Sequence, residues 1–515
     1  MARPLPPVSS GLLLLFAACQ APRPAAEPAA PPGTLAAASP APAREPARTE
    51  EEGWTLHTVE VPDGIVLEVG GLLELPDGAL LVSTRRGEIW RIEEPAGPEP
   101  HFQLFAEGLQ EPLGLLLDAD GVSVLTAERG GVTRLRDLDG DGRADRFENV
   151  CDDWEISGNY HEYAFGPRRD PEGNLWVTLN KPFGEEPFGR VPWRGWAVRI
   201  TPEGEMQPVC AGLRSPAGIE VAPWGEVFYT DNQGEWCGAG KLSILKEGSF
   251  HGHPWGIESC RLPESRVPHP GAVPDGMLMP EVPKLIPNFE LPAVWFPYDK
   301  MGKSPSGMVW DTTGGAFGPF DGQLFVGDQH HAWVMRVALE QVNGRWQGSC
   351  HAFRQGFVSG IVRLSFGRGP RLWAGMSNRG WGSRGTAPWG LQWLEWTGRL
   401  PFEIHHVEAR PDGFRLVFTG EVDPAAASDP DGYSLSSFTY LLHSSYGSDE
   451  VDKKSLRVLE ARVAEDRRSV DLRVEGLRAG YVHEILAHGP RSADGRRLLH
   501  PGAWYTLIEI PGPGS

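Results

Sequence analysis

The 515-residue sequence is poor in cysteine, in positive charge and in long apolar runs, and each shortage excludes a class of protein. None of its six cysteines lies in a CxxC or CxxCH pair, so zinc ribbons, thioredoxin-type redox pairs and covalent c-type haem are unsupported. Acidic residues (68) outnumber Lys and Arg (48), and the formal net charge of −20 disfavours binding to nucleic acid. A serine-hydrolase route is not expected, because the sequence has no GxSxG motif.

The first apolar run, residues 11–18, is too short to span a bilayer, and Cys19 follows it directly. Residues 15–19 resemble a bacterial lipoprotein cleavage box. We therefore expect residues 1–19 to be a lipoprotein-type signal peptide, with a plain secretory signal as the alternative. Residues 20–52 are nearly all Ala, Pro, Glu, Arg and Thr, which predicts a disordered linker. The expected location is the cell envelope, facing the periplasm or exterior, with membrane contact by lipid anchor only.

Residues 53–398 show no long helical periodicity and instead repeat one β unit. The unit is an apolar strand, a turn such as Asp77-Gly78 and a second apolar strand, usually followed by a third. A single unit cannot cover both of its faces, so the units must stack around an axis. The prediction is an all-β fold with a six-bladed β-propeller, and a long array of β-sandwiches is the alternative. The copies lie at 72–92, 113–135, 162–200, 217–245, 306–337 and 360–394.

Residues 399–515 alternate apolar and polar side chains, as half-buried antiparallel strands do. The clearest examples are 414–418, 455–459, 470–474 and 481–485. This pattern predicts a small immunoglobulin-like β-sandwich with no obvious chemistry of its own.

Residues 137–148 match the calcium-loop template, with carboxylates at its ligand positions and a glycine at the tight turn. The residues before the loop indicate a strand rather than a helix. We therefore predict a structural calcium loop between blade strands, and a bare Asp/Gly-rich turn is the alternative. The candidate residues are Asp137, Asp139, Asp141, Arg143, Asp145 and Glu148.

A second signal lies in the fourth repeat. The segment Gly212-Leu213-Arg214-Ser215-Pro216-Ala217-Gly218 precedes Asp231-Asn232-Gln233-Gly234-Glu235-Trp236, and His251-Gly252-His253-Pro254-Trp255-Gly256 follows. This arrangement resembles the soluble glucose/sorbosone dehydrogenase family over residues 60–395. The whole chain looks like the sorbosone-dehydrogenase-like proteins of planctomycete-type bacteria. The resemblance implies a six-bladed propeller that binds pyrroloquinoline quinone (PQQ) and Ca²⁺ at its axial face.

The resemblance also implies roles for individual residues. His161 matches the general base, which takes a proton as hydride leaves the sugar carbon, and a His near neutral pKa suits that role. Arg214 and Arg363 match arginines that contact the quinone. The calcium position corresponds to Gln233, Gly234 and Glu235.

The sequence departs from the family pattern at two places. Ser215 stands where an Asn is usual, and residues 328–333 of the fifth repeat contain no Lys. Gln329 or His330 would take that place, and Arg379 or Arg384 could compensate for the lost charge. Because strand ends converge in a propeller, we expect these residues, His161 and both arginines to surround one pocket.

These observations predict an envelope-anchored oxidoreductase for a sugar, aldose or polyol, using PQQ and Ca²⁺ and passing electrons to a separate acceptor. A non-catalytic ligand- or glycan-binding propeller and a calcium-dependent lactonase are the alternatives. We also expect that Cys237 and Cys260, which flank one loop region, form a disulfide.

Overall fold

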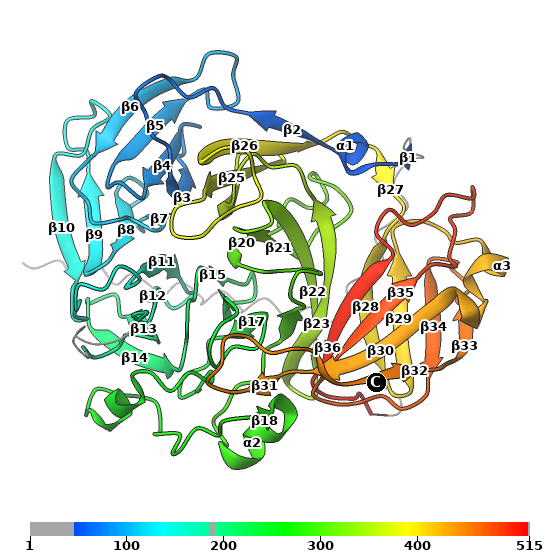
Figure 1. Ribbon diagram of the computed structural model, residues 1–515. Coiled ribbons are helices and arrows are strands. Elements are labelled where there is room, and N and C mark those ends of the chain that lie inside the picture. Colours follow the sequence, from blue (N-terminus) through cyan, green and yellow to red (C-terminus); the bar gives the residue numbers. More distant parts are fainter. Residues whose placement is uncertain (1–45, 185–190, 513–515) are drawn as a thin grey trace, which may run out of the picture.

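The computed structural model describes residues 46–184 and 191–512, which form mainly β-strands. Figure 1 shows four-stranded sheets arranged around a ring, with a second β domain beside it. The ring is a β-propeller, as the repeated unit predicts. The predicted signal peptide, and the predicted linker up to residue 45, lie outside the described residues. Within the described ranges, no helix has the length and apolar character needed to cross a membrane.

Six groups of four antiparallel strands follow one another along the described chain. The first three groups are β3 (Val69–Glu74), β4 (Leu80–Thr84), β5 (Ile89–Glu93) and β6 (His101–Ala106); β7 (Leu115–Leu117), β8 (Val124–Glu128), β9 (Gly131–Arg136) and β10 (Arg146–Cys151); and β11 (Ala164–Arg169), β12 (Leu175–Leu179), β13 (Trp196–Ile200) and β14 (Met206–Ala211). The others are β15 (Gly218–Val221), β16 (Val227–Asp231), β17 (Gly240–Ile244) and β19 (Val294–Phe296); β20 (Pro305–Trp310), β21 (Leu324–Asp328), β22 (Trp333–Val342) and β23 (Arg345–Arg354); and β24 (Ile361–Phe366), β25 (Arg371–Ser377), β26 (Trp389–Trp396) and β2 (Trp54–Thr58).

The innermost strands close a ring around the axis. Strands β3, β7, β11, β15, β20 and β24 contact one another in this order, and β24 returns to contact β3. The last group takes its outer strand from the other end of the chain, because β2 pairs antiparallel with β26. This pairing joins the two ends of the propeller by backbone hydrogen bonds.

The backbone conformation explains why the repeated turn contains glycine. Gly78, between β3 and β4, has a φ of 96°, and Gly121, between β7 and β8, has a φ of 76°. These are left-handed values that glycine adopts at little cost. The sequence therefore repeats its glycine wherever the first strand of a unit must turn tightly into the second.

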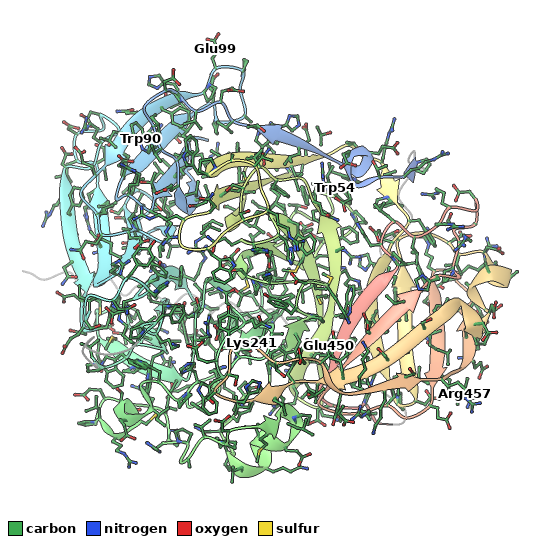
Figure 2. All side chains as sticks on the ribbon, in the orientation of Figure 1. Trp54, Trp90, Glu99, Lys241, Glu450 and Arg457 are labelled. Carbon is green, nitrogen blue, oxygen red and sulfur yellow. The ribbon has the colours of Figure 1, made fainter. Side chains whose placement is uncertain are left out.

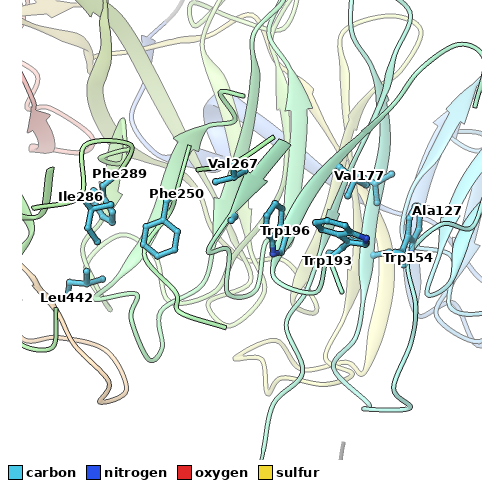
Figure 3. Packing of buried hydrophobic residues seen from close by; sticks show 14 of the residues in the cluster. Ala127, Trp154, Val177, Trp193, Trp196, Phe250, Val267, Ile286, Phe289 and Leu442 are labelled. Carbon is cyan, nitrogen blue, oxygen red and sulfur yellow. The ribbon is translucent and has the colours of Figure 1, made fainter. Parts of the chain in front are cut away.

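Apolar side chains fill the space between neighbouring sheets. Figure 3 shows Trp193, Trp196 and Trp154 side by side, with Val177 of β12 beside them. Each of the three tryptophans is at least 95% buried, so this layer holds the second and third groups together. The insertion after β17 covers the same cluster with η1 (Ile257–Arg261), β18 (Met277–Leu278), η2 (Met279–Glu281) and α2 (Val282–Leu285).

The C-terminal domain is a sandwich of two sheets, and one of them is continuous with the propeller. Strand β36 (Gly502–Leu507) pairs with β23, so that β35 (Tyr481–Ala487), β30 (Tyr433–Thr439) and β32 (Val451–Leu456) extend the fifth group. The other sheet contains β28 (Ile404–Arg410), β29 (Gly413–Phe418), β34 (Ser469–Val474) and β33 (Val458–Val463). The remaining elements are β27 (Leu400–Pro401), α3 (Pro424–Ala427), η3 (Pro430–Gly432) and β31 (Leu441–Leu442).

One predicted strand is interrupted. Residues 455–459 were expected to form a single strand, but β32 ends at Leu456 and β33 begins at Val458 in the opposite sheet. The chain crosses between the two sheets at Arg457, which the alternation of apolar and polar residues does not reveal.

The end of the predicted linker is ordered. Residues 46–53 contain β1 (Pro46–Ala47), which pairs with β27, and the short helix α1 (Glu50–Gly53). Ala47 is buried, and the Glu50 carboxylate accepts a hydrogen bond from His500 Nε2 at 2.9 Å. The linker prediction for 20–52 was wrong at this end, because Glu50, a charged residue of the tract, pairs with His500 of the C-terminal domain.

His500 lies between two carboxylates, since its Nδ1 is 2.7 Å from Glu403 Oε1. Burial by itself would lower the pKa of His500, but the charges and hydrogen bonds of Glu403 and Glu50 outweigh burial and raise it to about 10. The imidazolium therefore connects the N-terminal segment to the C-terminal domain at neutral pH.

We expect the stability contributed by His500 to decrease as the pH rises from 6.5 toward 10. Its pKa is higher in the folded protein than the usual 6.5, so the stabilisation is complete below pH 6.5 and is lost as pH passes the folded value of about 10. His500→Gln should lower the free energy of unfolding by about 1.5–3 kcal/mol at mildly acidic pH. Urea denaturation at mildly acidic pH and near the folded pKa checks this, and an equal loss at both would contradict it.

Candidate functional site

A cavity of about 380 Å³ lies at one end of the propeller channel. Most of its lining residues precede innermost strands or follow second strands, such as Arg214 before β15 and Gln233 after β16. Because these two strands run antiparallel, the start of one and the end of the other lie at the same end of each unit. The fold thus brings together residues that are far apart in the sequence.

Most of the residues predicted for the site line this cavity, and three do not. Gly234, His330 and Arg363 are outside the lining. The predicted residues that line it are His161, Arg214, Ser215, Gln233, Glu235, Gln329 and Arg379.

His161 precedes β11 and presents its imidazole to the cavity. The ring lies 4.6 Å from the Phe183 ring, centroid to centroid. Within the described residues, neither ring nitrogen has a hydrogen-bond partner. Burial lowers the pKa of His161, and so do the positive charges of Arg214, Lys181, Arg129 and Arg85. The imidazole is therefore neutral at neutral pH and able to accept a proton.

Arg214 is held on several sides. Its backbone N–H and that of Ser215 donate to the carboxylate of Asp231, at 3.0 and 2.7 Å, which fixes the turn before β15. Its guanidinium carbon lies 4.5 Å from the Phe183 ring centre and 5.2 Å from that of Tyr446. Two aromatic rings therefore contact the same cation at the cavity wall.

Glu235 neutralises part of the positive charge. Its carboxylate lies 3.1 Å from Arg214 Nη2 and 2.5 Å from Lys181 Nζ, and His253 Nε2 is 3.7 Å away. Burial opposes the charge of Glu235, but the contact with His253 and the charges of Arg214 and Lys181 hold the pKa of this carboxyl well below its usual range. Glu235 is therefore a fixed anion in an otherwise cationic site.

The predicted axial calcium site does not fit this geometry. The Gly234 carbonyl accepts hydrogen bonds from Gly447 and Cys237, at 2.9 and 3.1 Å, and is not free to bind a cation. Gln233 donates its Nε2 to the Gly238 carbonyl at 3.1 Å. The Glu235 carboxylate already forms ion pairs with Lys181 and Arg214, which would repel a calcium ion. The structure therefore does not support calcium binding at Gln233, Gly234 and Glu235.

Arg363 supports the wall from outside instead of lining the cavity. Its guanidinium donates to the carbonyls of Leu113 at 3.0 Å and Ala217 at 2.8 Å, in the second and fourth groups. The expectation that Arg363 faces the ligand was therefore wrong. A buried guanidinium without a carboxylate needs acceptors, and the inner-strand carbonyls provide them.

The fifth and sixth groups supply Gln329 and Arg379. Gln329 Nε2 donates to the Ser377 and Arg379 carbonyls at 3.1 and 3.3 Å, while His330 Nδ1 is 2.7 Å from the Gly382 carbonyl. The sequence left open whether Gln329 or His330 faces the site, and the structure shows that Gln329 lines the cavity.

Sequence reasoning missed several lining residues. Lys303 precedes β20 next to Ser304, whose carbonyl accepts the Gln329 N–H at 2.9 Å. It gives the fifth group the lysine that residues 328–333 lack. This lysine precedes the first strand of the fifth group, β20, whereas residues 328–333 lie at and after the end of its second strand, β21. The other cavity residues that were missed include Arg85, Tyr163, Phe183, Trp381 and Tyr446.

The cysteine prediction was also wrong. Among the described residues, Cys237 and Cys260 are free thiols, as are the other three cysteines. Cys237 is buried, and its Sγ donates to the Ala239 carbonyl at 3.2 Å. The loop is held by backbone pairing rather than by a disulfide.

The predicted calcium loop connects β9 and β10, and its ligand set is smaller than the template. The carboxylates of Asp137, Asp139 and Asp145 lie within 4.8 Å of one another. Asp141 does not belong to this group, and its carboxylate accepts the Arg143 N–H at 2.8 Å. Glu148 lies in β10 in ion pairs with Arg146, Arg136 and Arg134, because a strand carries its side chain away from the loop.

Calcium binding by this loop remains a prediction, now resting on Asp137, Asp139 and Asp145. Three adjacent carboxylates repel one another, so a bound cation should stabilise the second group. With an affinity in the millimolar range of extracellular modules, about 10 mM Ca²⁺ would add about 1.4 kcal/mol. We expect calorimetry to show a higher melting temperature with Ca²⁺ for the wild type and not for Asp139→Asn.

Glu99→Gln is the matched control, since Glu99, labelled in Figure 2, is an exposed carboxylate on the periphery of the ring and is not one of the three clustered carboxylates. It should keep the calcium response. A wild type that does not respond to Ca²⁺ would show that the loop is only a turn.

Comparison with known proteins gives a partial family match. A family model described as a domain of unknown function (DUF7133) matches residues 97–248. No curated protein is similar to the chain at a significant level.

Solved structures similar to the chain include three sugar-oxidising enzymes by name. A putative oxidoreductase (glucose dehydrogenase) of Thermus thermophilus is 23% identical, with 66% of this chain and 100% of that chain covered and a TM-score of 0.48. A PQQ-bound aldose sugar dehydrogenase of Streptomyces coelicolor is 16% identical (67% and 98% covered, TM-score 0.47). The holo PQQ domain of a Coprinopsis cinerea pyranose dehydrogenase is 12% identical (69% and 98%, TM-score 0.46). At these identities and TM-scores, the likenesses assign no activity to this chain.

Proposed function

We propose that the axial cavity binds an anionic quinone cofactor of the PQQ type and that the protein oxidises a sugar, aldose or polyol. One observation carries the proposal. In a chain with a net charge of −20, the cavity is lined by four cationic side chains and one carboxylate. They are Arg85, Arg214, Lys303 and Arg379, against Glu235. Each of the four has a carboxylate partner, in turn Glu111, Glu235, Asp299 and Glu68, but of these carboxylates only Glu235 belongs to the lining. The excess of cations over carboxylates on the cavity wall favours a ligand with several carboxylates.

The cavity residues fit PQQ, which is a tricarboxylate, better than the sequence alone suggested. The Lys303 ammonium lies 3.7 Å from Asp299 Oδ1 and 4.9 Å from the Tyr298 ring centre. Among the described residues no shorter ion pair holds it, so it remains able to bind an anion. Arg379 Nη1 lies 3.0 Å from Glu68 Oε2 and 3.4 Å from the Arg85 carbonyl, and its side chain is also partly exposed. When bound, PQQ would supply the acceptor for the two electrons of a hydride. The electrons would then leave to a separate acceptor.

His161 is the residue that we assign to proton transfer. Its neutral imidazole lacks a hydrogen-bond partner within the described residues and lines the cavity, as a general base requires. It would take the proton of the substrate hydroxyl at a ring nitrogen. Arg214 and Lys181 lie nearby and favour the neutral form of the His161 imidazole before it accepts a proton, because a further positive charge beside them is unfavourable.

The test is a titration of the purified protein with PQQ, followed by visible absorbance, and then dye reduction with a panel of sugars. Saturable binding and sugar-dependent dye reduction that requires PQQ would support the proposal. Because calcium does not fit at residues 233–235, we expect reduction to persist in EDTA. Absence of PQQ binding in the wild type would contradict the proposed function.

A second candidate is an anion-binding propeller without catalysis. Glu235 already pairs with Arg214 and Lys181, so two of the cations nearest to His161 are partly neutralised. Binding of PQQ without dye reduction for any sugar would favour this candidate. Lactone opening that depends on calcium would favour the lactonase alternative, for which the axial residues offer no suitable cation site.

We further propose that the six four-stranded groups are the blades of a six-bladed propeller, that the C-terminal domain is immunoglobulin-like, and that Cys19 carries a lipid anchor to the cell envelope. Mass spectrometry of the mature protein tests the anchor. An unmodified N-terminus elsewhere than Cys19 would contradict it.

A further inference from the structure

The C-terminal domain reaches the axial site through one loop. The loop of residues 443–448 follows β31 and leaves the sandwich to lie on the propeller, as the orange segment near β17 in Figure 1 shows. Strand β31 pairs with β18 of the propeller insertion. Leu442, at the end of β31, is fully buried and lies near Ile286 and Phe289 in Figure 3. The domain is therefore part of the propeller's hydrophobic core at this point.

Backbone hydrogen bonds hold the loop on both sides of Tyr446. Trp236 N–H donates to the His443 carbonyl at 2.8 Å, and Gly447 N–H donates to the Gly234 carbonyl at 2.9 Å. Ser448 N–H donates to the Gly238 carbonyl at 2.9 Å. These bonds join the loop to the same segment, residues 234–238, that carries Glu235.

The contact is too close to tolerate larger residues. A Cβ on Gly447, whose φ is 66°, would lie 2.6 Å from the Gln233 side chain. A Cβ on Gly234 would lie 1.8 Å from the guanidinium of Arg214. The loop and the cavity wall are therefore fitted to each other, and loop movement would displace Gln233 and Arg214.

Tyr446 itself is held in place and yet uncovered. Its ring contacts the Arg214 guanidinium, lines the cavity, and the residue remains 56% exposed. Trp381, which follows β25, also lines the cavity and is 42% exposed. A large aromatic side chain that is held on a docked loop, uncovered and next to a cationic group, as Tyr446 is, is suited to contact a ring that carries negative charge.

We infer that the C-terminal domain completes the binding site, and that Tyr446 is a contact residue that selects ring-bearing polycarboxylates. The inference rests on the proposed function for the cavity as an anion site, but not on catalysis. It assigns chemistry to a domain whose sequence showed no obvious chemistry of its own.

A pair of probe anions tests this directly. Benzene-1,3,5-tricarboxylate and citrate each carry three carboxylates, and only the first has a planar ring. Isothermal titration of the full chain should show tighter wild-type binding of the ring compound. Tyr446→Ala and Tyr446→Leu should each weaken that binding about 5- to 10-fold and change citrate binding by less than about two-fold. Tyr446→Phe should bind both anions like the wild type, since the ring makes the contact.

Ser445→Ala, an exposed neighbour outside the cavity lining, is the matched control and should change neither affinity. Equal losses for both anions, no loss in Tyr446→Ala, or no wild-type binding of either anion would each overturn the inference. Absence of PQQ-dependent sugar oxidation, with the expected difference between the two anions intact, would remove only the proposed function.

Discussion

His161→Ala should lose PQQ-dependent sugar oxidation by about 10²- to 10⁴-fold, the usual contribution of a general base. The imidazole lines the cavity, is neutral, and has no competing hydrogen bond in the described part of the chain. Cofactor affinity should change by less than about two-fold, because the charges that attract an anion belong to other side chains. Dye-reduction rates at saturating sugar, beside a PQQ titration by absorbance, measure the two effects separately.

His101→Ala is the control, since His101 is exposed on β6 and lies outside the cavity lining. It should oxidise sugar at the wild-type rate. If His161→Ala keeps wild-type oxidation, the assignment of the base is wrong and only the binding function survives. If it loses PQQ binding as well, His161 holds the ligand rather than moving a proton.

Trp54→Ala should destabilise the protein by about 3–5 kcal/mol, the cost of removing a buried tryptophan from a packed core. Trp54 lies in β2, the strand that closes the ring, and is 1% exposed. Its ring stacks on Phe320 at 5.8 Å and meets the edge of Phe353 at 4.7 Å, and its Nε1 donates to the Phe317 carbonyl at 3.0 Å. The side chain therefore connects the closing strand to the fifth group.

Trp90→Ala serves as the comparison, because Trp90 is a half-buried tryptophan in β5, within a group that does not close the ring. Figure 2 labels both residues. Urea denaturation followed by circular dichroism should show a loss for Trp90→Ala of less than half that for Trp54→Ala. Equal losses of unfolding free energy in the two variants would show that the closing strand contributes no more to stability than β5 does.

The repeating units were largely predictable from sequence, because strand alternation and turn glycines are local properties. Predicted unit 113–135 corresponds to β7, β8 and β9, and predicted unit 217–245 to β15, β16 and β17. The outer strands were not assigned. Strand β2 is more than 300 residues from its partner β26, and no local pattern indicates such a pairing.

The position of most of the site also followed from the sequence. His161, Arg214 and Gln329 lie at strand ends, and the geometry of a propeller brings these ends together at one end of the channel. Knowing that a residue lies near an axis does not determine where its side chain points. Arg363 shows this, since it precedes Leu364 in an innermost strand but directs its guanidinium to backbone carbonyls.

The sequence by itself therefore determined the strand repeat, the turns and the residues near the axis. Only the tertiary structure decided that Lys303 supplies a cation in the fifth group, that the Gly234 carbonyl is already hydrogen-bonded, and that Tyr446 forms part of the wall. The physical reason is the range of the interactions. Periodicity and turn propensity depend on neighbouring residues, whereas the docking of residues 443–448 on residues 234–238 depends on shape and hydrogen bonds formed between segments about 200 residues apart.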